Sequence, residues 1–427
     1  MTKSPQTLAQ KLLARAAGRD EVQEGETLTI GVDLAYAHDS SGPRRWQPLL
    51  DVWGVGLWDP SRVAIASDHY VPAVDVQSAS ILKATREFVT RHGIETFFDM
   101  VGICHLVLPE HGVIRPGTFV AGGDSHTTMG GAFGAYAAGF GAMDMAAIAA
   151  TGETWLNVPG TLRVELRGQW TRGVTAKDIM LLLCRKLGLA NSFTVVEYGG
   201  ELVDAMTMEE RMVLANMAAE LGCETGLVAA DATTAAYLEA CGKPLTSAET
   251  GQCLHPDADA VYASTCEINV AELTPQIAAP HSPENSDSVT AFTGVHIDQA
   301  YIGACVGAKI DDLRAAAEVV RGRQVAKGTR LLIAPASARV TRQATEEGTL
   351  AALVNAGALL LPSGCGACAG LGAGILAAGE TCISSTNRNF QGRMGSSEAS
   401  VYLGSPYSVA AAAIAGSIVD PRELMHG

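Results

Sequence analysis

Three cysteines in the last third of the chain have the residue types and spacing of iron-sulfur ligands. Cys305 follows Ile302-Gly303-Ala304, and Cys365 and Cys368 form a Cys-x-x-Cys pair. Three thiolates can hold three corners of a 4Fe-4S cube and leave one iron without a protein ligand. Such an iron can bind a substrate oxygen as a Lewis acid. The trio therefore predicts an open iron site.

An arginine-containing segment follows the cysteine pair. It reads Ser384-Ser385-Thr386-Asn387-Arg388-Asn389-Phe390-Gln391-Gly392-Arg393 and comes after an apolar stretch. Arg388 and Arg393 could lie on a solvated face, but a loop of this composition after an apolar strand more often binds carboxylates through guanidinium forks. Cations beside an open iron suit a polyanionic hydroxy acid.

Other interpretations of the cysteines are less favourable. A Cys-x-x-Cys pair can be half of a zinc site or a redox pair, and a lone cysteine is often a small buried hydrophobe. A structural zinc site usually has four protein ligands. No second Cys-x-x-Cys pair occurs among the other cysteines. These are Cys104, Cys184, Cys223, Cys241, Cys253, Cys266 and Cys382, which are interpreted as core residues. A thioredoxin-like pair would lie near the start of a βαβ unit, whereas Cys365 comes late in the chain.

Histidines and aspartates gather at the ends of predicted strands in the first third of the chain. Residues 63–67 lead to Asp68-His69, residues 100–108 carry His105, and residues 118–123 lead to Asp124-Ser125-His126. The carboxyl ends of strands in an open α/β sheet form the ligand crevice. One histidine alone is usually a core residue, but three at strand ends predict an acid-base site.

The neighbours Asp68 and His69 are not expected to pair with each other along a strand. Each is expected to orient residues from neighbouring loops. His38-Asp39 is interpreted as the cap of a turn before Gly42-Pro43.

The composition describes a globular protein and excludes some functions. The 427 residues include 48% hydrophobic and 18% charged residues, with 46 glycines, which together favour an α/β fold with two or three domains. The net charge of -15 argues against binding to nucleic acid or to an anionic membrane surface. No transmembrane segment is expected. The N-terminus lacks the apolar core of a secretory signal, so the cysteines are expected to be reduced in the cytoplasm.

The pattern along the chain predicts three α/β domains, with residues 1–159, 160–284 and 285–427. The first opens with an amphipathic helix at 8–18 and a strand at 27–33, and its glycine-rich run 130–150 is interpreted as a packed helix. The second has a strand at 161–166 and a helix at 208–221 that places Asn216 and Glu220 on one face. Residues 275–288 are the best linker candidate. From residue 289 onward strand and helix are expected to alternate again, through 329–334, 354–361 and the alanine-rich end.

The chain resembles the large subunits of the aconitase superfamily, most closely 3-isopropylmalate dehydratase and homoaconitase. The resemblance covers nearly the whole chain. It rests on the three cysteines and on Ala37-His38-Asp39, Asp68-His69, Gly102-Ile103-Cys104-His105, Gly123-Asp124-Ser125-His126-Thr127, Asn216-Met217-Ala218-Ala219-Glu220 and Ser385-Thr386-Asn387-Arg388-Asn389-Phe390. Several spaced motifs in the right order are very specific.

The resemblance implies a role for each motif. The cluster ligands would be Cys305, Cys365 and Cys368. The acid-base and orienting shell would be Asp68, His69, His105, Asp124 and His126, with Ser125, Arg388 and Arg393 binding carboxylates and with Asn216, Glu220 and Asn387 supporting the iron site.

The resemblance also implies a three-domain α/β/α arrangement around a central cleft and a hydro-lyase or isomerase acting on a 2-hydroxy di- or tricarboxylic acid. In this family a serine alkoxide on a swivelling fourth domain removes the proton from carbon. This chain ends without that domain, so a small subunit is expected to supply it.

Two segments depart from the family pattern. Relatives usually have Ser-Cys-Thr-Asn at the first ligand, where this chain has Ala304-Cys305-Val306-Gly307, and Gly42-Pro43-Arg44-Arg45-Trp46 is unusually basic. Lost polar neighbours can change the cluster potential or the shape of the substrate site. A substrate outside leucine and lysine biosynthesis is expected, such as a substituted malate, a maleate or citraconate. The alternative is an aconitase-fold protein with an altered or absent cluster, acting on a divergent substrate or as a non-catalytic binding protein.

Overall fold

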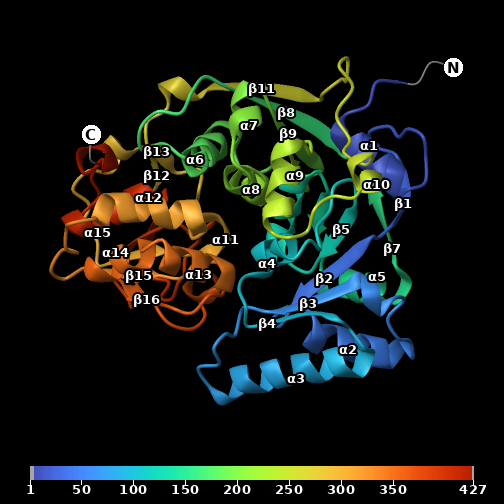
Figure 1. Ribbon diagram of the computed structural model, residues 1–427, viewed down its shortest axis with the longest axis horizontal. Coiled ribbons are helices and arrows are strands. Elements are labelled where there is room, and N and C mark those ends of the chain that lie inside the picture. Colours follow the sequence, from blue (N-terminus) through green and yellow to red (C-terminus); the bar gives the residue numbers. More distant parts are fainter. Residues whose placement is uncertain (1–3, 426–427) are drawn as a thin grey trace.

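Parallel sheets built from successive strand-helix units organise the chain. The computed structural model describes residues 4–425, and within them the strands form sheets of two, five, four and seven strands. The colours of Figure 1 show that the first, middle and last parts of the chain occupy separate regions of the molecule. The predicted α/β fold is confirmed.

The first region contains a five-stranded parallel sheet in the order β4-β3-β2-β5-β6. Its strands are β2 (Leu34–His38), β3 (Val63–Ser67), β4 (Thr96–Asp99), β5 (Phe119–Gly122) and β6 (Tyr136–Gly139). Every residue of β2, β3 and β5 is buried, as expected for central strands that are covered on both faces. An antiparallel pair lies beside this sheet, formed by β1 (Thr27–Gly31) and β7 (Glu153–Asn157).

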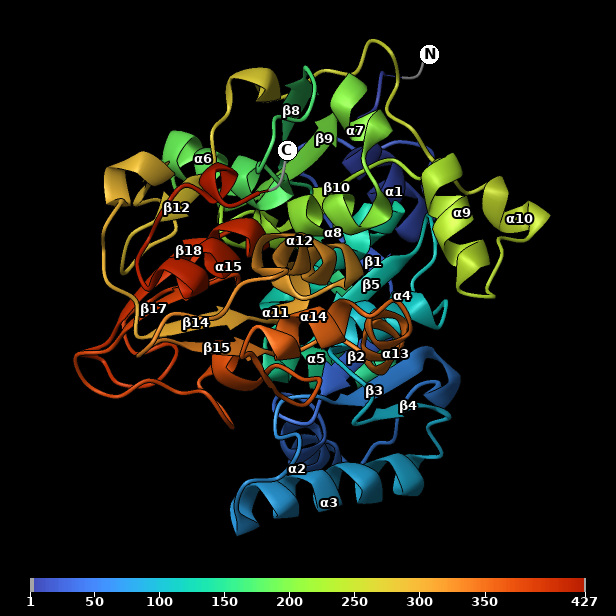
Figure 2. The same ribbon diagram turned by 60° about the vertical axis from the view of Figure 1, so that its left-hand side comes forward.

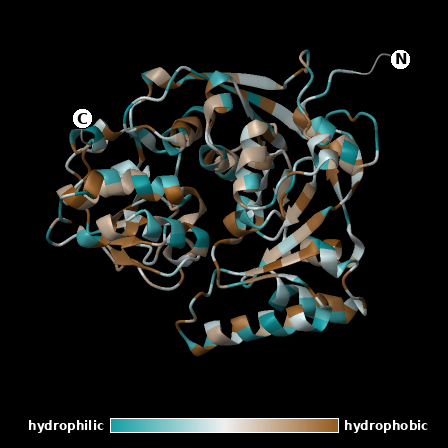
Figure 3. Cartoon of the chain, in the orientation of Figure 1, coloured by the Kyte–Doolittle hydropathy of each residue, from teal (hydrophilic) through white to brown (hydrophobic). Residues whose placement is uncertain are grey.

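Helices cover this sheet and connect its strands. They are α1 (Leu8–Ala16), α2 (Pro43–Trp53), α3 (Val76–His92), α4 (Cys104–Glu110) and α5 (Ala142–Thr151), with the 3-10 helices η1 (Pro60–Arg62) and η2 (Ser125–Phe133). Helix α3 begins where the Asp75 side chain accepts from the Ser78 N–H at 2.7 Å and ends at Gly93, which adopts the left-handed conformation. Apolar and polar residues alternate along α3 in Figure 3, so one side of the helix faces the sheet.

The second region contains a four-stranded parallel sheet in the order β10-β9-β8-β11. Its strands are β8 (Gly160–Arg167), β9 (Thr194–Gly199), β10 (Thr225–Leu227) and β11 (Ser264–Asn269). Its helices are α6 (Ala176–Leu187), α7 (Glu201–Ala205), α8 (Met208–Asn216), α9 (Ala232–Ala240) and α10 (Ser247–Thr250), with η3 (Met217–Ala219) and η4 (Val270–Glu272).

The third region contains a seven-stranded sheet in the order β13-β12-β18-β17-β14-β15-β16. Its strands are β12 (Gln276–Ala278), β13 (Ser286–Ser288), β14 (Gln299–Ile302), β15 (Arg330–Ile333), β16 (Leu359–Leu360), β17 (Thr381–Ser384) and β18 (Ser400–Gly404). Strand β12 is antiparallel to both of its neighbours, and the remaining pairs are parallel.

The helices of this region surround the parallel strands, as the rotated view of Figure 2 shows. They are α11 (Ala304–Gly307), α12 (Ile310–Val320), α13 (Ala338–Glu346), α14 (Thr349–Asn355) and α15 (Pro406–Ala415), with η5 (Val289–Phe292), η6 (Gly366–Ala369) and η7 (Pro421–Glu423). Within residues 4–425, no helix combines the length and the apolar character needed to cross a lipid bilayer.

Several elements differ from the sequence-based expectations. The run 130–150 is not one helix, because Gly134 in the left-handed conformation ends η2 and is followed by β6 and α5. The expected helix at 208–221 ends at Asn216 and continues as the 3-10 turn η3. The expected linker 275–288 instead contributes β12 and β13 to the third sheet. We keep the three-domain division as a proposal, and a second boundary just before β12 fits this sheet better.

The first and second regions meet through backbone at Gly131. This residue of η2 accepts from the Val228 N–H at 3.0 Å, and a Cβ built on it would lie 1.9 Å from the carbonyl oxygen of Gly226 in β10. The helix that begins with Ser125 and His126 is therefore fixed against the second sheet by a contact that only glycine permits.

Gly131→Ala is expected to lower the free energy of unfolding by about 1–3 kcal/mol, because the clashing atom is rigid backbone. Gly56→Ala is the matched control, since a Cβ there would meet nothing within 4 Å. Thermal or denaturant unfolding measures both variants. Equal stability of the two variants would contradict this account of the contact.

Candidate active site

The ends of β2 and β3 bring Asp39, Asp68 and His69 together in the protein interior. The Asp39 carboxylate accepts from the backbone N–H groups of Asp68, His69 and Tyr70 at 3.4, 3.1 and 2.9 Å. Asp39 thus fixes the loop that follows β3. The expectation that His38-Asp39 only caps a turn is therefore too limited.

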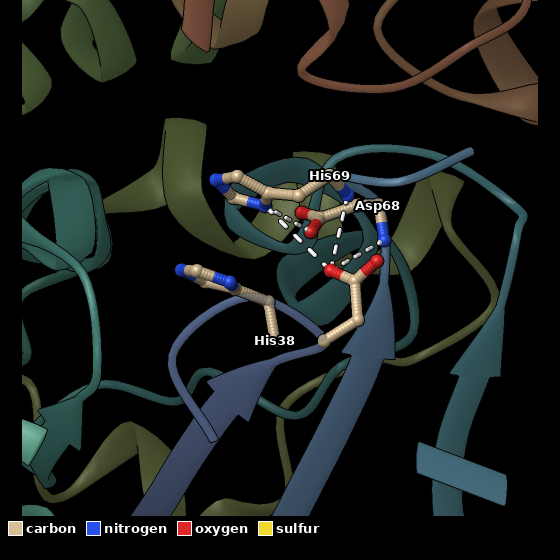
Figure 4. Close-up of side chains that lie close together, drawn as sticks. His38, Asp68 and His69 are labelled. Carbon is tan, nitrogen blue, oxygen red and sulfur yellow. Dashed lines mark hydrogen bonds and ion pairs between the residues drawn. The ribbon is translucent and has the colours of Figure 1, made fainter. Parts of the chain in front are cut away.

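Asp68 and His69 bind each other directly. His69 Nδ1 lies 2.7 Å from Asp68 Oδ1, while Asp68 Oδ2 accepts from the Cys104 N–H at 2.7 Å. The expectation that these neighbours would not pair was wrong, because the chain leaves strand geometry after Ser67 and successive side chains no longer point to opposite sides. Figure 4 shows the two side chains close together above the end of the strand.

The His38 ring stacks on the His69 ring. The ring centroids are 3.8 Å apart and the planes differ by 15°. Figure 4 shows one ring lying over the other. His38 Nδ1 accepts from the Ser40 N–H at 3.2 Å, so a neutral His38 carries its proton on Nε2. That nitrogen lies 3.6 Å from Asp124 Oδ2. His38 therefore connects the His69 pair to a second carboxylate.

His105 lies in the first turn of a helix and not on the expected strand at 100–108. Met100 and Gly102 have positive φ values of 60° and 137°, and they turn the chain into α4. The turn is held against the third region, because the Ile103 N–H donates to the Ala336 carbonyl at 2.9 Å. A strand-end pattern could not reveal this turn.

Asp124 is the common partner of the histidines. Its Oδ1 lies 3.0 Å from His105 Nε2 and 3.5 Å from His126 Nδ1, and it also accepts from the His126 backbone N–H at 2.7 Å. On the other side of the His105 ring, Nδ1 lies 3.0 Å from the buried Tyr36 hydroxyl. The ring orientation of His105 is therefore fixed at both nitrogens.

A chain of polar contacts joins the three regions. His126 Nε2 of the first region lies 3.1 Å from Glu220 Oε1 of the second. The same oxygen accepts from Arg388 Nε of the third region at 2.6 Å. Glu220 is only 4% exposed, and its Oε2 is buried with no hydrogen-bond partner in the described chain. One free acceptor therefore remains at this junction.

The charges of the site follow from burial and from these partners. Burial alone would lower the pKa of His69, but Asp68 and Asp39 raise it to about 9. Burial likewise opposes the proton on His126, but Glu220 and Asp124 raise its pKa to about 9. For His105, burial outweighs Asp124 and lowers the pKa. Of these three histidines, His69 and His126 are therefore imidazolium cations at neutral pH, and His105 is a neutral imidazole.

The carboxylates are correspondingly weak bases. Burial favours their neutral forms, but the histidines facing Asp68 and Asp124 hold both pKa values well below the ordinary range. His126 and Arg388 also lower the pKa of Glu220 against the effect of burial.

The three cysteines lie next to this network. The Asn216 amide donates to Cys305 Sγ at 3.1 Å, and the Asn387 amide lies 3.6 Å from the same sulfur and donates to Asn216. The Cys365 N–H donates to the Asp68 carbonyl at 2.8 Å. The side chains of Asn216 and Asn387 thus meet at the sulfur of Cys305.

The donor set fits an iron-sulfur cluster better than a single metal ion. Two sulfurs bound to one zinc ion at about 2.3 Å each can be no more than about 4.6 Å apart. Within residues 4–425, the three thiols do not form a group whose ligand atoms all lie within 4.8 Å of one another. Separate irons of one cluster do not require such closeness, and amide donors to a ligand sulfur are typical of cluster sites.

The groups expected to bind carboxylates have unused hydrogen-bonding capacity. Arg393 Nε is buried with no partner in the part of the chain that the structure describes, and Ser125 is exposed at the start of η2. The Arg388 guanidinium is occupied at Nε by Glu220, and its carbon lies 5.9 Å from the centre of the Phe390 ring. These groups can therefore receive an anion without losing protein contacts.

The structure adds residues to the site that the sequence argument did not assign. They are His38, Asp39, Tyr36 and Lys177. The ammonium group of the buried Lys177 donates to the Thr386 carbonyl at 2.6 Å and so holds the arginine segment in place. Burial lowers the pKa of Lys177 to about 8. A lysine next to the helix-capping residues Thr175 and Asp178 gave no sign of this role.

The chain belongs to the aconitase family. The model of that family, described as aconitate hydratase, matches residues 13–293 and 287–416. The chain is similar to 3-isopropylmalate dehydratase large subunit 1 of Methanopyrus kandleri, with 43% identity over 98% of this chain and 99% of that protein. It is 42% identical to the homoaconitase large subunit of Thermus thermophilus, over 98% of both chains. Among solved structures, aconitase X of Thermococcus kodakaraensis aligns with 84% of each chain, with a TM-score of 0.47 and 16% identity. Membership of the aconitase family makes the α/β fold aconitase-like, as predicted.

Asp68→Asn is expected to lower the pKa of His69 from about 9 to below its ordinary value near 6.5, because burial then acts without the paired carboxylate. Histidine NMR of the cluster-free chain against pH measures the shift. His126 is the internal control and should still titrate near 9.

The same pair makes stability depend on pH. The raised pKa of His69 means that its contribution is complete below pH about 6.5 and is lost as the pH rises through about 9. Asp68 contributes above pH about 4, where the unfolded carboxyl ionises. The free energy of unfolding of the wild type should therefore exceed that of the Asp68→Asn variant by the largest amount between about pH 4 and pH 6.5. A difference in stability that does not change with pH would contradict the pairing.

Proposed function

We propose that this chain is the large subunit of an iron-sulfur hydro-lyase that adds water to, or removes it from, a small 2-hydroxy di- or tricarboxylic acid. The observation that carries the proposal is that Cys305 meets Asn216, and that His126 and Arg388 meet at Glu220, where separate regions of a member of the aconitase family converge. Dehydration of a hydroxy acid needs help for the leaving hydroxyl, for the carboxylates and for the proton on carbon, and the first two are accounted for here.

The proposed cluster ligands are Cys305, Cys365 and Cys368, with Asn216 and Asn387 donating to the first sulfur. A bound 4Fe-4S cluster would supply a Lewis-acidic iron for the substrate hydroxyl. The ten cysteines of the chain are all free thiols, as a cluster protein of the reducing cytoplasm requires.

His69 is the proposed acid for the leaving hydroxyl. Its Nδ1 is held by Asp68, whereas its Nε2 has no hydrogen-bond partner among the residues described, so that N–H can point to substrate. The paired carboxylate keeps the imidazolium protonated at neutral pH and fixes the plane of the ring. The stacked His38 restricts the other face of the ring.

Arg388, Arg393 and Ser125 are the proposed carboxylate-binding groups. A buried guanidinium nitrogen without a partner is costly in the protein alone, and a substrate carboxylate satisfies it through a charge-assisted bond. Glu220 orients Arg388 and His126 at the same time, so it links carboxylate binding to the histidine network.

The remaining requirement is a base for the proton on carbon, which we assign to a small subunit carrying a swivelling domain. The two relatives named above are large subunits and support such a partnership. Their names indicate 3-isopropylmalate and homoaconitate chemistry, and we propose a related substituted malate, maleate or citraconate.

The altered motif around Cys305 supports a distinct substrate or cluster environment. Gly307 packs so closely on Ser385 that an added Cβ would lie 2.3 Å from the serine hydroxyl, which instead bonds the Gly307 carbonyl at 3.0 Å. The Ser385 hydroxyl therefore occupies the space that a polar side chain at position 307 would fill, while the ligand Cys305 is kept.

The direct test is anaerobic purification together with a candidate small subunit that carries the swivelling domain. Iron and sulfide analysis should show one 4Fe-4S cluster, and unsaturated diacids should lose their conjugated-enoate absorbance as water is added. A cluster-free protein without hydratase activity would favour the alternative, an aconitase-fold binding protein.

Cys365→Ser is expected to abolish both cluster and activity, because it removes one of three ligands. Cys382→Ser is the matched control, since that thiol is buried on β17, donates to the Ile383 carbonyl at 3.5 Å and packs in an apolar cluster. Iron content and the optical spectrum distinguish the two variants. Equal cluster content in both would show that the ligand assignment is wrong.

A further inference from the structure

The Tyr301 hydroxyl is a buried donor without a partner. Tyr301 is 0% exposed, and its hydroxyl has no hydrogen-bond partner among residues 4–425. A buried hydroxyl that bonds nothing is destabilising relative to phenylalanine, which has the same shape without the polar atom. Native proteins seldom retain such a group unless it serves a ligand.

The hydroxyl lies between the two cysteine segments. A Cβ built on Gly303 would lie 2.6 Å from the Tyr301 hydroxyl oxygen, and one built on Gly366 would lie 3.5 Å from it. Gly303 is two residues before Cys305, and Gly366 directly follows Cys365. Glycine at both positions therefore leaves room for the phenol between the proposed ligands.

The rest of Tyr301 is fixed and cannot turn the hydroxyl elsewhere. Its backbone lies in the middle of the third sheet, where β14 pairs with β15 and β17, and its carbonyl accepts from the Ser385 N–H at 3.0 Å. The ring belongs to a small apolar cluster that includes Leu332, Ala367 and Met394. No group of this cluster forms a hydrogen bond with the hydroxyl within residues 4–425, whereas the cysteine segments lie on its other side.

We propose that the Tyr301 hydroxyl donates a hydrogen bond to a sulfur of the cluster site, either a bridging sulfide or a ligand thiolate. The inference rests on the proposed function, because the acceptor exists only when the cluster is bound. Hydrogen bonds to cluster sulfurs stabilise the more negative, reduced state and so raise the reduction potential. Tyr301 is then a positioning and tuning residue and does not touch the substrate.

Tyr301→Phe separates this role from a structural one. In the cluster-loaded protein, the variant should have a lower cluster reduction potential and should lose iron to a chelator about tenfold faster, the effect of one hydrogen bond to a charged acceptor. In the cluster-free full-length chain, the variant should unfold at the same temperature as the wild type or higher, because only an unsatisfied group has been removed.

Tyr198→Phe is the matched control. Its buried hydroxyl donates to Met180 Sδ at 3.5 Å inside the second region, so its removal should change stability equally in the loaded and cluster-free proteins and leave the potential unchanged.

The outcomes distinguish the two proposals. Wild-type protein without iron or sulfide after anaerobic preparation would overturn the proposed function and this inference together. A wild-type cluster whose potential and rate of iron loss are unchanged by Tyr301→Phe would overturn the inference alone. Equal destabilisation of loaded and cluster-free protein by Tyr301→Phe would also overturn it, because the hydroxyl would then be structural.

Discussion

A partly buried carboxylate that serves several histidines holds the site together. Asp124 contacts His105 and His126 and lies 3.6 Å from His38, and His126 continues through Glu220 to Arg388. Unpaired charge is expensive in the protein interior, and for His126 and Arg388 the partner is the buried Glu220 of the second region. The electrostatic network therefore fixes the three regions relative to one another at the place where the proposed cluster and substrate bind.

Close backbone contacts make this convergence possible. Gly131 meets Gly226 where the first two regions join, and Gly307 meets Ser385 beside the first cysteine. At each contact a side chain would occupy the space of a main-chain or hydroxyl atom. The Ala304-Cys305-Val306-Gly307 segment shows the consequence, since Ala304 is held at a φ of 68°, a conformation that surrounding packing must stabilise. The neighbouring arginine segment holds this ligand segment in place, because the Ser385 hydroxyl bonds the Gly303 N–H and the Gly307 carbonyl.

Sequence patterns predicted the helices and strands whose apolar residues recur at regular spacing. Strand β3 and the junction at Asp124 follow from apolar runs that end in polar residues, and Asp124 does meet the predicted His105. The patterns failed where one backbone torsion decides the path, as in the turn at Met100 that places His105 on a helix. They also missed Lys177 and Asp39, because the partners of these residues are main-chain groups, which every sequence contains.

The charges of the site suit one half of the proposed reaction, the protonation of the leaving hydroxyl, and not the removal of the proton from carbon. Asp68, Asp124 and Glu220 are all bound to histidine or arginine, and their lowered pKa values make them poor acceptors of a proton from carbon. The same pairing makes His69 and His126 ready acids at neutral pH. His105 is neutral, but both of its ring nitrogens are occupied, by Asp124 and by the Tyr36 hydroxyl. We therefore propose that the base lies on the mobile domain of the proposed small subunit and reaches the site only after the substrate has bound.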